Sequence, residues 1–246
     1  MPGTEVVVMG RRENPVDRTV PARATLADFL RARRHQAQMT YQQMARRSTS
    51  VSAATFERAA SGAVVPSWET VEEFILANIS DRDFYLEYLI DEARQLWIRA
   101  RRATRAPYYV RTAPDPTLLA TPADFLRALR RQHVWAGYPS PGEMERACGP
   151  GRLPATTARR IIAGDVLPVD PQQAVAFLRA CHVVKAVDLE RWLAAAVRIL
   201  RDVPSRARNL DKWIQAHEQL VQKARTETVA ASVSRLPAPH EGRAAA

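Results

Sequence analysis

The sequence has few cysteines, and their positions exclude the usual cysteine-based sites. Its 246 residues contain only Cys148 and Cys181, which lie far apart and form neither a CxxC pair nor the His/Cys spacing of a metal site. We expect two free, buried thiols and no metal ion. No glycine-rich phosphate loop occurs, and the five histidines have no paired carboxylate motif around them. These absences argue against an enzyme and give no reason to expect a cofactor.

Long apolar runs are also missing. The longest, WLAAAV at 192–197, is far shorter than the ~20 residues of a membrane-spanning helix. The first residues, MPGTEVVVMGRRENP, place their arginines after a very short apolar stretch, which is the wrong order for a secretion signal. We therefore expect a cytoplasmic protein, associated with the nucleoid if it binds DNA.

Lysine is scarce, whereas arginine is abundant. All but three of the 36 basic residues are arginine, and the formal net charge is +10. Arginine suits bidentate contacts to phosphate and guanine, but a GC-rich genome produces the same bias, so both explanations stay open. The positive charge is spread along the chain rather than gathered in a tail. A DNA-binding surface would therefore form only when folding brings arginines together.

An internal repeat organises the chain. Three blocks recur in the same order: TLADFLRARR (25–34) with TPADFLRALR (121–130), SAATFERAASGAVVP (52–66) with PATTARRIIAGDVLP (154–168), and VEEFILAN (71–78) with AVAFLRAC (174–181). The offset between the copies grows along the chain, which indicates an insertion of about six residues early in the second copy. Such a duplication predicts two similar domains.

Each copy is predicted to be a bundle of five short helices. Apolar residues recur at three- and four-residue spacing, and no alternating strand pattern competes apart from EVVVM near the start. Gly62 and Gly164 are expected to end the matched third helices. The fold class is therefore all-α. Helix starts are indicated by N-cap residues with a polar partner three positions on: Thr25 with Asp28, Thr40 with Gln43, Ser140 with Glu143, and Asp170 with Gln173.

The predicted organisation has six parts. They are an N-terminal arm (1–19), a first domain (20–105), a linker (106–116), a second, divergent domain (117–203), a C-terminal helix (204–228) and a disordered tail (229–246). The C-terminal helix is amphipathic, and its apolar seam is a candidate surface for a partner helix or a homodimer. The seam consists of Leu210, Trp213, Ile214, His217, Leu220 and Val221.

Residues 39–75 resemble the helix-turn-helix domain of the XRE (Cro/C1-type) repressor-like family through the run MTYQQMARRSTSVSAATFERAASGAVVPSWETVEEFI. MGRRENPVD followed by LADFLRARR is similar to the opening of its actinobacterial members, and the second copy to a more divergent version. The resemblance implies that the third helix of each copy lies in the major groove, with the second helix across the phosphate backbone. Two departures stand out. The turn RSTSVS lacks the usual glycine, and Tyr41 replaces the commonest glutamine, while still offering a hydroxyl to a phosphate.

The resemblance also implies which residues meet DNA. In the first copy Phe56, Ala59 and Ala60 should face inward, and the helix-2 start, the helix-3 cap and the outward face should bind: Thr40, Tyr41, Gln42, Ser52, Ala53, Ala54, Glu57, Arg58 and Ser61. In the second copy the set is Ser140, Thr156, Thr157, Arg159 and Arg160. Expected phosphate contacts are Arg31, Arg33, Arg34, Arg46, Arg47, Arg127, Arg130 and Arg131.

The residues on these outward faces leave alternatives open. Glu57 can accept a hydrogen bond from a cytosine amino group, or it can simply pair with Arg46, Arg47 or Arg58 on the surface. Arg159 and Arg160 can attract DNA, or they can form an ordinary solvated face.

Two functions are consistent with the pattern. The leading hypothesis is a sequence-specific, double-stranded-DNA-binding protein, a transcriptional regulator that uses two different recognition helices on a non-palindromic or tandem site. The alternative is a protein-interaction adaptor built on degenerate helix-turn-helix domains. Salt dependence separates the two, because binding through several phosphates weakens steeply with salt.

Overall fold

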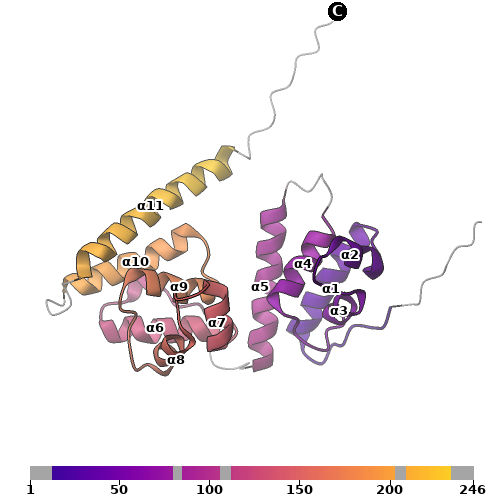
Figure 1. The fold of residues 1–246 in the computed structure, drawn as a ribbon, viewed down its shortest axis with the longest axis horizontal. Coiled ribbons are helices and arrows are strands. Elements are labelled where there is room, and N and C mark those ends of the chain that lie inside the picture. Colours follow the sequence, from indigo (N-terminus) through magenta and orange to yellow (C-terminus); the bar gives the residue numbers. More distant parts are fainter. Residues whose placement is uncertain (1–12, 80–84, 106–111, 203–208, 234–246) are drawn as a thin grey trace, which may run out of the picture. The chain divides into compact units, whose positions relative to one another are not determined.

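Every element that the structure describes is helical. The computed structural model describes residues 13–79, 85–105, 112–202 and 209–233, and within these ranges it contains α-helices and one short 3-10 helix but no strand (Figure 1). The prediction of an all-α fold is confirmed. No helix in these ranges combines the length and the apolar character needed to span a bilayer. The chain divides into two compact units, Met1–Pro107 and Tyr108–Ala246.

The first unit is built from five described helices, most of which begin at a hydroxyl cap. The side-chain oxygens of Thr40, Ser52 and Ser67 each accept the backbone N–H three residues further on, at 3.2–3.3 Å. These bonds satisfy N–H groups that a helix start otherwise leaves unpaired. The helices are α1 (Pro21–Gln36), α2 (Tyr41–Arg47), α3 (Ala53–Ala59), α4 (Trp68–Ala77) and α5 (Leu86–Arg105).

The predicted start of α1 at Thr25 is wrong. The helix begins one turn earlier, with Pro21 at its first position, where a missing N–H leaves nothing unpaired. Thr25 therefore lies inside the helix, and its hydroxyl donates to the Pro21 carbonyl at 2.9 Å. Asp28, expected as its capping partner, forms an exposed ion pair with Arg18 at 3.0 Å.

The core of the first unit lies where α1 to α5 meet. Phe56 of α3 packs edge-to-face against Phe74 of α4, with ring centroids 5.5 Å apart, and both rings are fully buried. Trp97 of α5 is also buried, and its indole N–H donates to the Pro66 carbonyl at 2.8 Å. Burying one such aromatic side chain contributes about 1.5–3 kcal/mol. Phe56 therefore fixes how α3 sits on the bundle.

The described residues of the second unit form six α-helices and the 3-10 helix η1. Its predicted caps Ser140 and Asp170 accept the N–H groups of Glu143 at 3.3 Å and Gln173 at 2.7 Å, as expected. Gly164 ends α8 in the left-handed conformation, with φ 94°. The elements are η1 (Pro116–Leu118), α6 (Pro122–Trp135), α7 (Pro141–Cys148), α8 (Ala155–Ala163), α9 (Pro171–Ala180), α10 (Ala186–Arg201) and α11 (Leu210–Val233).

An arginine of α1 and an arginine of α6 make similar contacts, at positions that the sequence match does not align. The Arg31 guanidinium donates to the Ala60 carbonyl at 2.8 Å, and the same bond at the end of α8 is made by Arg130 to Ile162 at 3.0 Å. The sequence match instead aligns Arg31 with Arg127, almost one turn away. A shift of about one turn (3.6 residues) keeps the same helix face apolar, so residue similarity alone cannot choose between the two registers.

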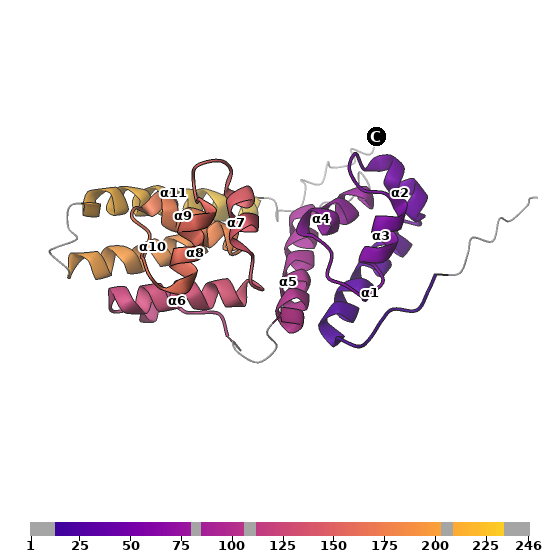
Figure 2. The same ribbon diagram turned by 60° about the horizontal axis from the view of Figure 1, so that its bottom comes forward.

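The C-terminal helix α11 packs within the second unit, along α10 (Figures 1 and 2). Trp213 and Leu220 are buried, and His217 Nε2 lies 2.7 Å from Glu190 Oε1 of α10; Leu210, Ile214 and Val221 are half-buried. Much of the seam is therefore covered within the unit, because an amphipathic helix buries its apolar face on the nearest apolar surface. A role of this helix in a dimer or partner contact stays a prediction. The helix also continues to Val233, so the predicted tail begins too early; residues 234–246 lie outside the described ranges.

Candidate nucleic-acid interface

Helix α3 presents the face that the sequence predicts. Phe56, Ala59 and Ala60 are buried, which confirms the inward set. On the opposite side Ala54, Glu57 and Arg58 are exposed, while Ala53 and Ser61 are half-buried. Arg58 donates to the Thr55 hydroxyl at 3.2 Å, so its guanidinium lies back along the helix. The exposed face therefore carries a methyl group, a carboxylate and a guanidinium.

Glu57 is unpaired on this face. The alternative that it pairs with Arg46, Arg47 or Arg58 is wrong, because the structure gives its carboxylate no ion pair or hydrogen bond among the described residues. An unpaired exposed carboxylate repels phosphate at a distance and accepts hydrogen bonds at contact.

The glycine-free turn between α2 and α3 is organised by Ser48. Its hydroxyl oxygen accepts the N–H of Val51 at 3.0 Å, and the hydroxyl donates to Glu73 Oε2 of α4 at 2.9 Å. A serine side chain thus replaces the bonds that a glycine-containing turn makes with its backbone. Sequence reasoning noticed the missing glycine but not this substitute. The feature of the sequence that could have indicated it is the serine hydroxyl at the C-terminal end of α2.

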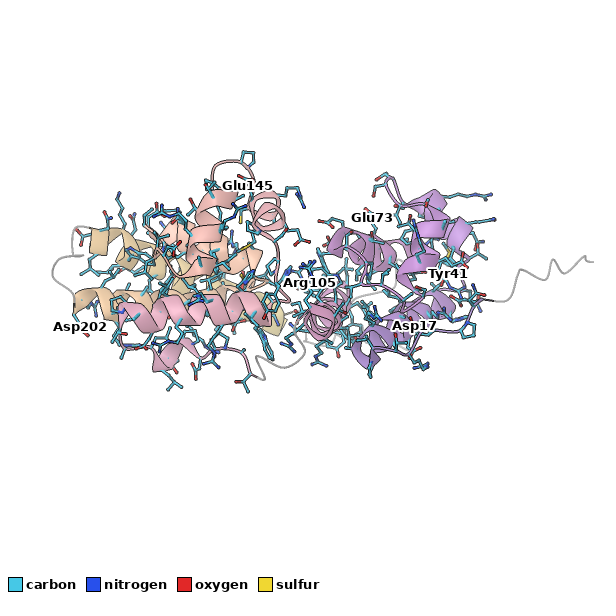
Figure 3. All side chains as sticks on the ribbon, turned by 90° about the horizontal axis from the view of Figure 1, so that it is seen from below. Asp17, Tyr41, Glu73, Arg105, Glu145 and Asp202 are labelled. Carbon is cyan, nitrogen blue, oxygen red and sulfur yellow. The ribbon has the colours of Figure 1, made fainter. Side chains whose placement is uncertain are left out.

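Glu13 holds the side chains that were expected to contact phosphates. Its carboxylate forms an ion pair with Arg31, whose Nε lies 3.2 Å from Oε1, and it accepts a hydrogen bond from Arg34 Nη2 at 2.8 Å. The hydroxyl of Tyr41, which is labelled in Figure 3, donates to the same carboxylate. The Arg34 guanidinium also stacks over the Tyr41 ring, 4.6 Å from its centroid. All four side chains are largely buried or half-buried. Burial first, and then the Glu13 contact, raise the pKa of Tyr41 above its ordinary value of 10.0.

The Glu13 contact was not predicted from the sequence. Residues 13–19 belong to the segment expected to be an arm, yet they pack on the first unit. The Asp17 N–H donates to the Ser61 carbonyl at 2.8 Å. A Cβ at Gly62, whose φ is +77°, would lie 2.6 Å from the Asp17 carbonyl oxygen, so only glycine fits beneath this segment. No local sequence pattern marks a carboxylate that bonds to side chains some twenty residues away.

The other side chains of the first unit that were predicted to contact DNA differ in how exposed they are and in whether they already have a partner. Thr40, Gln42, Ser52 and Arg46 are exposed, and Arg33 is half-buried. Arg47, although exposed, donates to the Ala77 and Ile79 carbonyls at 3.3 and 3.4 Å, beside the C-terminal end of α4. Exposed cations and the N-terminal end of α2 remain suited to an anionic backbone.

Helix α8 is the more basic of the two candidate reading helices. Thr156, Arg159 and Arg160 are exposed, whereas Thr157 is half-buried. Ala158 and Ile161 are fully buried and turn these residues outward. Pro154 occupies the N-cap position without a side-chain bond, but the neighbouring Leu153 is fully buried and anchors the turn.

Helices α6 and α7 flank α8. Ser140 begins α7 with a capping box. Of the arginines predicted to contact phosphates from α6, Arg131 is exposed, Arg127 pairs with Asp124 at 3.0 Å, and Arg130 is tied to the end of α8.

The two thiols and the described acidic and histidine groups form no metal site. Cys181 is buried and Cys148 half-buried, both without a disulfide, as predicted. Burial raises the pKa of both thiols, which keeps them protonated and weakly nucleophilic. Within the described ranges no cluster of histidine, cysteine or carboxylate side chains could hold a metal ion.

Comparison with known protein families gives a match to part of the first unit. Residues 25–77, from within α1 to the end of α4, match the family described as a helix-turn-helix domain. Domains of this class bind DNA, with the second helix of the motif in the major groove; in this stretch that helix is α3. No curated protein and no solved structure gives a significant match.

Proposed function

We propose that this chain is a sequence-specific double-stranded-DNA-binding protein and a transcriptional regulator that reads DNA with α3 and α8. One observation carries the proposal: the helix-turn-helix match spans α2 and α3, and α3 exposes Ala54, Glu57 and Arg58 on one face. A major-groove helix needs such short and hydrogen-bonding side chains directed away from its core.

On α3 we assign a reading role to the alanines and Glu57. Methyl groups contact the thymine methyl, and a free carboxylate accepts from the cytosine amino group. The same carboxylate lowers affinity for every other sequence, since it faces phosphates without compensation. Replacing Glu57 with Gln should therefore tighten non-specific binding and relax sequence preference.

On α8 we assign the stronger attraction to Arg159 and Arg160. We treat the second unit as a divergent copy of the first. The order of its helices supports this, as do the equivalent arginine bonds to Ala60 and Ile162. Arginine bonds guanine in a bidentate manner and also phosphate. Two unlike reading helices predict a site whose halves differ in sequence.

Which side chains can contact the DNA phosphates depends on which of them are exposed and have no partner within the protein. Arg46 and Arg131 are exposed, as are Gln42 and Thr40 at the start of α2. Arg31, Arg34 and Tyr41 contribute only if Glu13 releases them. The proposed phosphate-binding set is therefore smaller than the sequence pattern predicts.

The test is selection of bound duplexes from a random pool by the full chain, followed by affinity measurements across about 50–200 mM salt. We expect an enriched motif and a steep loss of affinity with salt. Arg159→Ala with Arg160→Ala should weaken binding and flatten the salt dependence. Arg191→Ala with Arg225→Ala, two exposed arginines on α10 and α11, removes the same charge and should change affinity little. No enriched motif would overturn the proposal.

A second function, protein-interaction adaptor, is favoured by one specific observation. Glu13 occupies the positions on Arg31, Arg34 and Tyr41 that a phosphate would take. A surface that has satisfied its own cations is better suited to a protein partner than to DNA. DNA affinity that is absent, or that does not change with salt, would decide for the adaptor.

A further inference from the structure

The second unit has an open cavity, lined in part by exposed residues, that the DNA-binding proposal does not use. Its volume is about 830 Å³, within the usual range of about 300–1,000 Å³ for small-molecule sites. Its lining residues come from α7, α9, α10, α11 and the turn before α8. Its apolar wall includes Val175 and Ala176 of α9, Leu193 of α10 and Leu220 of α11. All of its lining residues belong to one unit, so the cavity does not depend on how the two units are arranged.

Three cations line this cavity from three different segments. Arg152 lies in the turn before α8, Arg179 on α9 and Lys223 on α11. Neither arginine has an ion-pair partner among the described residues, and Lys223 has only the exposed Glu227 at 3.8 Å. Burial raises the pKa of Cys148, which also lines the cavity, and the positive charges of Arg152 and Arg179 oppose that rise.

One carboxylate lines the cavity, and it is already engaged. Asp170 Oδ1 accepts the N–H of Gln173 at 2.7 Å, where it caps α9. A capping carboxylate is stabilised by the positive end of its own helix. Asp170 therefore leaves Arg152 and Arg179 without an ion-pair partner among the described residues. The cavity is therefore electropositive and half apolar.

At the matching residues of the first unit a carboxylate is present. There Ser48, at the end of α2, donates to Glu73 of α4 at 2.9 Å. In the second unit the thiol of Cys148, at the end of α7, donates to the carbonyl of Ala176 of α9 at 3.1 Å. The second unit thus has a methyl group where the first has a carboxylate. Helix α11, which follows the five shared helices, covers the space that this leaves.

We propose that this cavity binds a small organic anion, a carboxylate or phosphate ester joined to an apolar body. The anionic group lies among Arg152, Arg179 and Lys223, and the apolar body against Val175, Leu193 and Leu220. Such a ligand joins α11 to the turn that precedes α8, because Gly151 and Arg152 of that turn line the same space. The proposal stands independently of DNA binding.

The test titrates the full chain with 8-anilinonaphthalene-1-sulfonate, an anionic aromatic dye that fluoresces in apolar sites. N-phenyl-1-naphthylamine, which has nearly the same rings without the sulfonate, is the matched uncharged probe. We expect saturable binding of the anionic dye at one site, and binding of the uncharged dye about ten-fold weaker, since a charge-assisted contact contributes at least that much. Inorganic phosphate should compete with the anionic dye.

Arg179→Gln with Lys223→Gln should weaken the anionic dye about ten-fold or more and leave the uncharged dye unchanged. Arg225→Gln is the control, because it removes an exposed cation from α11 outside the cavity; its dye affinity should equal that of the wild type. Three outcomes overturn the proposal: no saturable binding, equal affinity for both dyes, or equal affinity in the pocket variant and the control. The third would place the dye in the apolar hollow beside Trp213.

Discussion

Glu13→Gln should destabilise the first unit more than any other single loss of charge on its surface. The Glu13 side chain is 20% exposed, and its partners Arg31 and Arg34 are 16% and 13% exposed. Glutamine keeps one acceptor oxygen but turns an amide N–H₂ group toward the other arginine. One charge-assisted bond, worth about 1.5–3 kcal/mol, is thus replaced by a donor facing a cation. We expect the free energy of unfolding to fall by about 2–3 kcal/mol.

Hydrogen exchange measured on peptides of α1 and α2 is the suitable assay, because it reports the first unit separately from the second. A loss of about 2 kcal/mol raises the opening equilibrium, and with it the exchange of core amides, about 30-fold. The matched control is Asp28→Asn, which removes the same charge from the exposed Arg18–Asp28 pair, whose side chains are 67% and 46% exposed. That loss should be below about 1 kcal/mol.

The same substitution removes the negative charge that faces Arg31, Arg34 and Tyr41 beside the start of α2. DNA affinity at low salt should therefore rise, and the dependence of log affinity on log salt should steepen by up to about 0.9 for each additional phosphate that these arginines neutralise. Equal exchange rates in Glu13→Gln and Asp28→Asn would refute the view that Glu13 is a structural clamp. An unchanged salt dependence would refute the view that it covers a phosphate site.

Three further predictions concern the same unit. The folded-state pKa of Tyr41 is raised. The contribution of its protonated hydroxyl to the free energy of unfolding is therefore complete below about pH 10, and it is lost as the pH rises further, by up to about 1.4 kcal/mol per pH unit. Urea unfolding at about pH 9 and 11 should show this loss in the wild type and a smaller one in Tyr41→Phe; equal losses would contradict it. Ser48→Ala removes the Val51 and Glu73 bonds and should cost about 1–2 kcal/mol by urea unfolding, whereas the exposed Ser50→Ala should cost under about 0.5. Gly62→Ala should lower the melting temperature because its Cβ meets the Asp17 carbonyl oxygen; a wild-type melting curve would show that residues 13–19 do not pack there.

Local signals in the sequence predicted local structure well. The caps at Thr40, Ser52 and Ser140, the left-handed Gly164 and the buried Phe56 depend on residues within a few positions of one another. At Thr25 the same cap pattern failed, because Pro21 offers an equally good start one turn earlier. A helix that begins at either place buries the same apolar face, so the apolar pattern could not distinguish the two starts.

Long-range contacts in the candidate site could not be predicted. Glu13 contacts side chains of α1 and α2 that are far from it in the sequence, and α11 packs its apolar seam on α10 rather than leaving it exposed. Nothing in the neighbouring residues of Glu13 or Trp213 specifies those partners. The sequence therefore indicates which side chains are suited to DNA, while the folded chain decides which of them are free.

The central claim, that α3 and α8 both read DNA, is tested most directly by hydroxyl-radical footprinting of the full chain on a selected duplex. We predict two protected stretches about one helical turn, ~34 Å, apart, of which one disappears in Arg159→Ala with Arg160→Ala while the other remains. A single protected stretch that this double substitution leaves unchanged would contradict the claim.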